Sequence, residues 1–286
     1  MALALLISLI CALGWGLVDL GYKIGSKYNV GSWMFALTAE LFAVVVWGGY
    51  FLAYVQELPL LDKGMVPILF VVAFAESIGI VFLANGMKYA VSSAAPIAGS
   101  FSVLSPIFAF FIFKESLGGF QILALVCVAV AIYLLSGMKL EKNKGLFWGI
   151  LTMIFWGASS TLMAIPARSM GEYNSIFWIK TFSLIVIGTV LVLSSKRREQ
   201  IVKKPFALWK FAFLIGILET VATSAWIIGV AHFSFIQIAI IASLYPVIPV
   251  LVIWFFKNID KEDRPNKKNI SGLVFSVLAV LLIILS

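Results

Sequence analysis

The chain has 286 residues, of which 62% are hydrophobic and 12% charged, and its net charge is +8. A soluble domain usually carries about 25% charged residues, so this composition excludes a soluble enzyme or a soluble nucleic-acid-binding domain. The basic residues lie in short segments between apolar runs, where they report on membrane topology rather than on a polyanionic partner. We therefore expect an integral membrane protein that contacts the lipid bilayer and does not bind nucleic acid.

Apolar runs of about 20 residues recur along the whole chain, and each is long enough to cross a bilayer core of roughly 30 Å as a helix. The expected fold class is an all-α integral membrane protein with ten transmembrane helices. These helices cover residues 2–24, 33–55, 65–88, 92–113, 119–138, 145–165, 174–195, 207–231, 235–256 and 270–286. The first run lacks a basic leading segment and a cleavage site of small residues, so we expect it to remain as the first helix.

Lys and Arg residues are distributed unequally between the loops that these helices define. Loops after odd-numbered helices, with their borders, hold 16 of them, whereas loops after even-numbered helices hold three, Lys63, Lys114 and Arg168. Because positively charged loops stay on the cytoplasmic side, we expect the odd-numbered loops in the cytoplasm and both termini outside. This distribution is typical of a multi-pass protein of the cell membrane, either a plasma or an inner membrane.

The two halves of the chain are similar to each other. Glu76 and Glu219 lie 143 residues apart within apolar helices, and Trp15 and Trp156 lie 141 residues apart. The offset of 143 also pairs Gly86 with Gly229, Ser100 with Ser243, Pro106 with Pro249 and Lys114 with Lys257. Self-similarity over such a long period indicates an internal duplication.

The duplication predicts two domains of five helices each. The first repeat covers residues 1–138, a connecting loop covers 139–144, and the second repeat covers 145–286. Because five is odd, the second repeat enters the membrane from the opposite side, which produces an inverted repeat with a pseudo-two-fold axis in the membrane plane. Because the two halves are related by symmetry, a site between them can open first to one side of the membrane and then to the other.

Segments typical of a known family lie in the first, fourth and ninth predicted helices. They are Leu13-Gly14-Trp15-Gly16, Ser105-Pro106-Ile107-Phe108-Ala109 with Lys114-Glu115-Ser116-Leu117 and Gln121 beyond it, and Ala242-Ser243-Leu244-Tyr245-Pro246-Val247. With these segments in this order, nearly the whole chain resembles the drug/metabolite transporter superfamily, and within it the EamA-like ten-helix transporters. The resemblance implies a cavity lined by helices one, three, four, six, eight and nine, with helices five and ten as outer scaffold. It also implies export of amino acids or similar compounds.

One segment departs from the family pattern. After its ninth helix the family usually has Gly-Glu-x-Leu, whereas this chain has Phe256-Lys257-Asn258-Ile259 and a charged extension to Asn269. An acidic gating motif is therefore not expected in the second half.

Glu76 and Glu219 are the leading candidates for binding a substrate or a coupling ion. An ionised side chain at the bilayer centre costs about 2.5 to 3.5 kcal/mol on insertion scales, so both are expected to face the bundle interior. Matched positions in two halves predict one central site that exchanges protons or binds a cation. The alternative is that each carboxyl group pairs with or caps another helix. Helical spacing places Thr223 and Trp226 on the face of Glu219.

The remaining candidates each have a structural alternative. Asp19 either joins the site or forms an ion pair with Lys23, one helical turn away. Trp15 and Trp156 either wall the cavity or mark the membrane interface. Glu40 and Lys180 are the other charges near the middle of predicted spans, and we expect them to neutralise each other.

Helices four and nine are rich in small residues and proline. Ser100, Ser243 and Tyr245 are candidates for substrate contacts, and the alternative for Tyr245 is that its hydroxyl group has a packing partner instead. Proline removes a backbone hydrogen bond, and it permits a hinge or frees a carbonyl group toward a cavity. The hinge or gating candidates are Pro96, Pro106, Pro246 and Pro249. The alternative is tight helix packing with tolerated kinks.

The expected function is secondary active transport, in the export direction, of a small organic metabolite such as an amino acid, with proton coupling through Glu76 and Glu219. The chain has no phosphate-binding Gly-x-x-x-x-Gly-Lys-Ser/Thr motif, so we do not expect ATP-driven transport. A passive facilitator or channel is the alternative. A membrane-embedded lipid-modifying enzyme is disfavoured, because one His and the isolated Cys11 and Cys127 offer no catalytic cluster. We expect no cofactor and no metal, and either a monomer or a homodimer.

Overall fold

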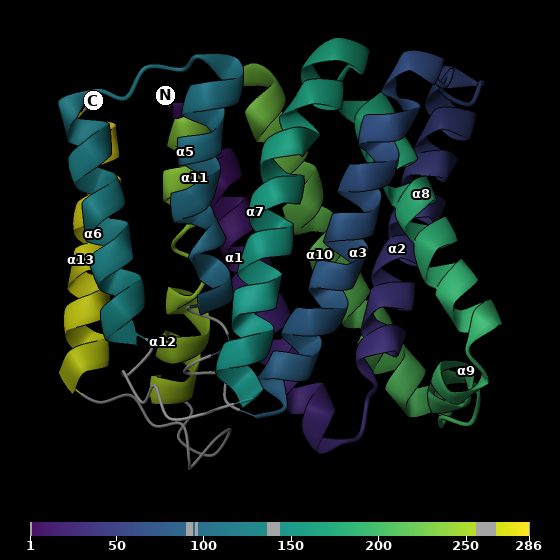
Figure 1. Ribbon diagram of the computed structural model, residues 1–286. Helices are drawn as coiled ribbons and strands as arrows, with labels where there is room; N and C mark the ends of the chain where they lie inside the picture. The colour runs from purple at the N-terminus through teal and green to yellow at the C-terminus, as the bar shows by residue number, and fades with distance from the viewer. Residues whose placement is uncertain (1, 90–93, 95–96, 136–143, 256–266, 286) are drawn as a thin grey trace.

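The structure is a computed structural model that describes residues 2–89, 94, 97–135, 144–255 and 267–285. Within these residues every regular element is a helix (Figure 1). The first half contains α1 (Ala2–Lys27), α2 (Ser32–Tyr50) with a π-helical extension (Phe51–Val55), a 3-10 turn (Lys63–Met65), α3 (Val66–Met87), α5 (Phe101–Phe113) and α6 (Gly119–Leu135). The second half contains α7 (Lys144–Met170), α8 (Glu172–Leu193), α9 (Ser195–Val202), α10 (Phe206–His232), α11 (Phe235–Ala242), α12 (Val247–Phe255) and α13 (Lys267–Ile284).

Most of these helices are built to lie in a membrane. Among the described residues, seven helical spans are long and apolar enough to cross a bilayer, and three shorter apolar helices cover Ile97–Phe113, Gly119–Leu134 and Ile270–Ile284. Large apolar side chains such as Phe111, Val192 and Val274 are exposed on the outside of the bundle, where lipid solvates them. The chain is therefore a multi-pass, all-helical membrane protein.

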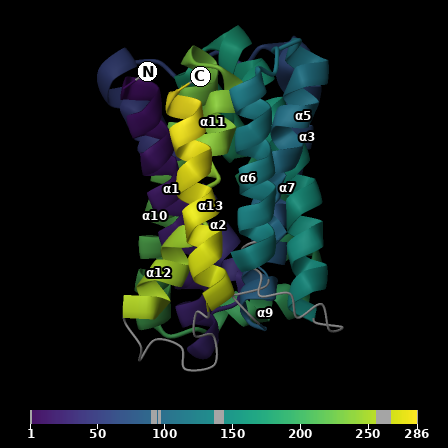
Figure 2. The same ribbon diagram turned by 90° about the vertical axis from the view of Figure 1, so that its left-hand side faces the viewer.

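The helices stand side by side and alternate in direction (Figure 1). α1 begins, and α13 ends, at the same end of the bundle, which we call the termini side (Figure 2). α7, the first helix of the second half, begins at the opposite end. α6 and α13 pack against each other at one edge of the molecule, and α1 lies inside, in contact with α3, α10, α11 and α12.

Two helices are interrupted at positions that the repeat relates. The predicted ninth helix breaks between α11 and α12 at residues 243–246, because Pro246 lacks an N–H and disfavours helical geometry in the residue before it. In the first half, α5 begins at Phe101, directly after a turn at Ser100. Pro106 and Pro249 lie inside helices that continue through them, and Pro96 lies outside the described residues.

The structure also differs from the expected boundaries. α7 continues to Met170, five residues beyond the expected end at 165. The segment after α8 forms the short helix α9, which the sequence analysis treated as loop because it is rich in charged residues. The guanidinium carbon of Arg197 in α9 lies 4.4 Å from the ring centroid of Trp33, and this cation–π contact holds α9 against α2.

Hydrogen bonds and close approach of the backbones hold the interior helices together. This is expected in a bilayer, where the hydrophobic effect does not drive helices to associate. The Thr38 hydroxyl donates to the Ala212 carbonyl oxygen at 3.0 Å, which joins α2 to α10. Gly216 lies so close to this contact that a Cβ there would be 2.9 Å from the Thr38 carbonyl oxygen. On the other side, the Ser183 hydroxyl donates to the Ala73 carbonyl oxygen at 3.2 Å and joins α8 to α3.

Candidate functional site

A central cavity lies between the two halves of the chain. Helices α1, α3 and α5 contribute side chains from the first half, and α7 and α10 contribute side chains from the second. The lining residues are Trp15, Glu76, Phe101, Trp156, Ser159, Ser160, Met163, Glu219, Thr223 and Trp226. The space between them is about 300 Å³, including its opening. The centre of a water molecule can occupy only about 20 Å³ of this space, enough for one or two waters, so an organic solute enters the cavity only when the surrounding helices separate.

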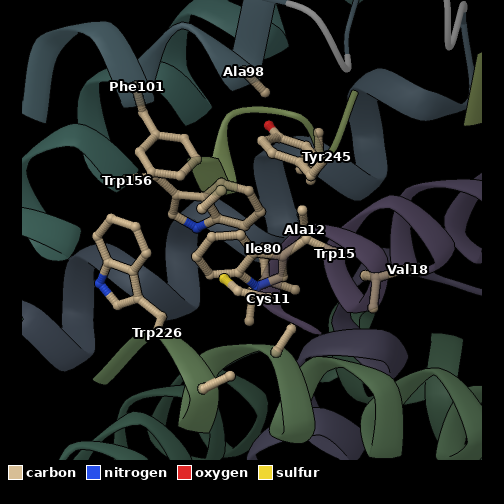
Figure 3. Close-up of a cluster of buried hydrophobic side chains, with 14 of the residues drawn as sticks. Cys11, Ala12, Trp15, Val18, Ile80, Ala98, Phe101, Trp156, Trp226 and Tyr245 are labelled. Atoms are coloured by element: carbon tan, nitrogen blue, oxygen red, sulfur yellow. The ribbon is translucent and has the colours of Figure 1, made fainter. Parts of the chain in front are cut away.

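Four of the ten lining residues are aromatic, and their rings lie together in one buried cluster (Figure 3). The rings of Trp15 and Trp156, which the repeat relates, are stacked with centroids 6.2 Å apart. The Trp15 ring also lies 5.6 Å from Trp226 and 5.8 Å from Phe101, measured between centroids. Tyr245 meets the edge of the same cluster, with its ring 6.0 Å from that of Trp15. Trp15 therefore stands at the centre of an aromatic box built by both halves.

The carboxyl group of Glu76 is neutralised by Lys180 of α8. The Nζ atom of Lys180 lies 2.5 Å from Oε1 of Glu76 and 3.3 Å from Oε2 of Glu40 in α2. All three side chains are almost fully buried, so their mutual attraction is weakly screened. The expected pairing of Lys180 with Glu40 is confirmed, and Glu76 is an additional partner that the sequence analysis did not anticipate.

The carboxyl group of Glu219 has different surroundings. Its Oε1 atom accepts a hydrogen bond of 2.9 Å from the Thr223 hydroxyl, one turn further along α10. Its Oε2 atom is buried and has no hydrogen-bond partner among the described residues, although only 2% of the residue is exposed. The indole N–H groups of Trp15 and Trp226 are also buried without a partner there. Uncompensated buried polar groups are costly, so a ligand that satisfies them gains free energy.

The other candidate residues lie around the cavity rather than along its wall. Asp19 is buried one helical turn from Trp15, and its Oδ2 atom has no hydrogen-bond partner among the described residues. The Ser243 hydroxyl donates to the Ile240 carbonyl oxygen within its own chain segment. Ser100 is half-buried at the turn before α5. The structure thus brings together Trp15, Glu76, Trp156, Glu219, Thr223 and Trp226, but does not place Asp19, Ser100, Ser243 or Tyr245 in the lining.

Four lining residues were not anticipated from the sequence. Ser159 and Ser160 follow Trp156 by three and four residues, which is the spacing of one helical face and could have identified them. The hydroxyl oxygens of Ser160 and Ser105 lie 2.7 Å apart and connect α7 to α5. Phe101 and Met163 carry no signal in the sequence, because an apolar residue in a membrane helix faces lipid as often as a cavity.

An ion pair joins α7 to the segment after α5 on the termini side, where α5 and α7 both end (Figure 1). Arg168 at the end of α7 lies 2.8 Å from Oε1 of Glu115, which follows α5. Glu115 also accepts a 2.9 Å hydrogen bond from the Ser234 hydroxyl at the start of α11. The Nε atom of Arg168 donates to the Val230 carbonyl oxygen of α10 at 3.0 Å. We call this group, Glu115, Arg168, Val230 and Ser234, the latch.

A second pair on the same side joins α8 to α10. His232 is the last residue of α10, and its Nε2 atom lies 3.0 Å from the Glu172 carboxylate at the start of α8. This contact joins two helices of the second half, whereas the Arg168–Glu115 pair joins the second half to the first.

Comparison with known proteins identifies a family. A family model described as the EamA-like transporter family matches residues 2–137 and again residues 143–285. No curated protein matches the chain. A solved crystal structure is similar over 99% of this chain and 96% of its own, with a TM-score of 0.72 and 16% sequence identity. At that identity the likeness establishes the fold alone.

Proposed function

Because the chain belongs to the EamA-like transporter family, we propose that it is a secondary active transporter that exports a small organic metabolite, with amino acids as the first class to test. One observation carries the proposal: carboxyl and indole groups from both halves line a single buried cavity in the middle of a membrane protein. A site at the midplane between two repeats is typical of secondary transporters.

We propose ten membrane crossings arranged as two inverted repeats, over residues 1–138 and 145–286 with a connecting loop between them. The opposite starting points of α1 and α7 support this topology, as do the interruptions at Ser100 and Ser243. The charge distribution supports odd-numbered loops in the cytoplasm, so the termini side would face outward from the cell membrane. Tyr245 and Pro246 lie in the interruption of the ninth helix, where a hinge would act.

Transport then follows from rocking one half against the other. With the latch closed, the cavity is shut off from the outside. Breaking the contacts of Glu115 with Arg168 and Ser234, and so separating the end of α5 from α7 and α11, would open the cavity outward, and a matching separation on the cytoplasmic side would open it inward. The buried carboxyl groups are exposed to each side in turn, so Glu219 and Glu76 can exchange protons in both orientations. Lys180, Glu40 and Asp19 are the charged groups near them.

Counterflow in proteoliposomes tests the proposal. Vesicles loaded with unlabelled amino acids should accumulate the same labelled compound transiently, and protein-free vesicles should not. Replacing Glu219 with Gln should abolish the pH dependence of this exchange. The matched control is Glu199→Gln, which removes an exposed carboxyl group from α9, far from the cavity lining. Flux without counterflow would instead support a passive facilitator or channel, and an unchanged pH response in E219Q, E76Q and their double variant would contradict proton coupling there.

A further inference from the structure

We infer that the cavity recognises a positively charged nitrogen at Glu219, so that it binds small amines with a ring or apolar body in preference to the corresponding amino acids. The inference rests on the proposed function, since it names the substrate class of that same site. It is carried by two features that lie side by side: a buried carboxylate oxygen of Glu219, without a hydrogen-bond partner among the described residues, and three aromatic rings.

The two carboxyl groups that line the cavity differ in whether a cation neutralises them. Lys180 already neutralises Glu76 and contacts Glu40, and its Nζ atom is fully buried between them. Within the part of the chain that the structure describes, the charged residues that line the cavity are Glu76 and Glu219. Among the described residues, Glu219 receives a hydroxyl hydrogen bond from Thr223 and forms no ion pair. An ammonium group placed at Oε2 of Glu219 would supply the missing charge and hydrogen bond together.

The second feature is the group of three aromatic rings. Trp15 and Trp226 are within 5.6 Å of each other, measured between ring centroids, and Phe101 lies 5.8 Å from Trp15 and 6.2 Å from Trp226. The faces of such rings attract cations, Trp most strongly, and the attraction grows when the pair is out of water. The same rings provide an apolar surface for the rest of the ligand. A carboxylate surrounded by aromatic faces is therefore suited to a cation with an apolar body.

Among the described residues, the cavity has no free cation that could pair with a carboxylate on the ligand. The carboxylate of a bound amino acid would need a cation or several donors to replace its water shell. Lys180 is engaged by two acids, and Arg168 is held in the latch by Glu115. The indole N–H groups of Trp15 and Trp226 are neutral donors, and they compensate a carboxylate less well than a charged partner would. Removing the ligand's carboxyl group should consequently strengthen binding.

Three probes of similar size isolate the charge on the ligand: phenethylamine, phenylalanine and 2-phenylethanol. Calorimetric titration of the purified protein in detergent should give the tightest binding for phenethylamine, with phenylalanine and 2-phenylethanol at least about tenfold weaker, the factor that 1.4 kcal/mol produces. Equal affinity for the amine and the amino acid would overturn the inference, as would tighter binding of the alcohol.

Variants locate the binding site. Glu219→Gln should weaken phenethylamine binding at least about tenfold while leaving 2-phenylethanol binding unchanged, and Glu199→Gln should leave both unchanged. Because E219Q could fold poorly, Glu219→Asp provides a second measurement: it keeps the negative charge and should retain part of the preference for the amine. Amine binding that persists undiminished in E219Q would overturn the assignment to Glu219.

The experiments separate a failure of the amine-binding inference from a failure of the proposed transport function. Glu219-dependent amine binding without any counterflow of phenethylamine would leave the inference standing and contradict the proposed transport function. Counterflow of phenylalanine by a protein that does not bind phenethylamine would leave transport standing and overturn the inference.

Discussion

Glu76 and Glu219 occupy the same position in the two repeats, but they face different partners. Glu76 is held by Lys180 at 2.5 Å, whereas Glu219 receives a hydrogen bond from Thr223 and has a second oxygen without a partner among the described residues. The Trp156 indole N–H donates to the Glu76 carbonyl oxygen at 3.4 Å, whereas the indole N–H of Trp15 has no such partner there. Duplication thus produced two equivalent sites that have since diverged.

Two substitutions between the repeats explain the divergence. At the offset of 143, Lys180 corresponds to Leu37, so the first half has no lysine that could reach Glu219 from the equivalent position. Glu40 corresponds to Ser183, whose hydroxyl donates to the Ala73 carbonyl oxygen instead of joining an ion pair. Glu76 is therefore held in an ion pair with Lys180 in this conformation, whereas one oxygen of Glu219 is available to a ligand or a proton.

The largest effect is expected from Lys180→Met. It leaves Glu40 and Glu76 buried without a counter-charge, and breaking a buried ion pair in this way destabilises a protein by roughly 3–5 kcal/mol. The melting temperature of the purified protein should fall strongly. Adding Glu40→Gln and Glu76→Gln to the same chain should recover much of the loss, because no unpaired charge then remains. An unchanged melting temperature in K180M would contradict the structural role of this network.

A medium effect on stability is expected when alanine replaces one of the two glycines that follow the stacked tryptophans. These glycines are Gly16 and Gly157, and the effect is expected at Gly16 only. A Cβ at Gly16 would lie 2.7 Å from the Tyr245 carbonyl oxygen, whereas one at Gly157 would lie 3.7 Å from the Leu104 Cβ, an ordinary contact. Gly16→Ala should cost about 1–3 kcal/mol through overpacking. Gly157→Ala should be neutral or slightly stabilising, because alanine is the better helix former. Thermal unfolding of both variants side by side measures the difference, and equal effects would mean that the two halves pack alike here.

The smallest effect on stability is expected at the latch, where the repeats also differ: Glu115 corresponds to Asn258, which lies outside the described residues. The Arg168 and Glu115 side chains are 32% and 19% exposed. A partly exposed pair contributes about 0–1 kcal/mol, so Arg168→Gln should scarcely change the melting temperature.

Access to the cavity should nevertheless increase when the latch is lost. A single cysteine at Ser160, in a chain with Cys11 and Cys127 replaced by Ala, should react faster with a membrane-impermeant thiol reagent added from the termini side in R168Q. The same chain with Lys203→Gln is the control, because Lys203 belongs to an exposed pair on α9. Equal labelling rates in all three chains would show that the latch does not hold that side closed.

Much of the arrangement could be predicted from the sequence. The repeat pairs Trp15 with Trp156 and Glu76 with Glu219. Helical spacing places Thr223 and Trp226 on the same face of their helix as Glu219. In the structure all six side chains line one cavity. These side chains lie together because a duplicated chain brings matched positions of its two halves to a common axis, and their role in binding stays a prediction.

What could not be predicted depends on which helix faces meet. Spacing along α8 does not reveal that Lys180 reaches α3 as well as α2, because that depends on how α8 is rotated against both neighbours. The proline-rich ninth helix predicted a hinge, but of its two prolines only Pro246 lies in the interruption, while Pro249 lies in the first turn of α12, where a missing N–H is harmless. Phe101 was missed because nothing distinguishes a cavity-lining phenylalanine from a lipid-facing one in the sequence.

The asymmetry between the two carboxyl groups is tested most directly by difference infrared spectroscopy of phenethylamine binding. The account predicts that binding perturbs a carboxylate stretching band, that this change disappears in Glu219→Gln, and that it persists in Glu76→Gln. A change that survives in E219Q, or one that disappears in E76Q alone, would contradict it.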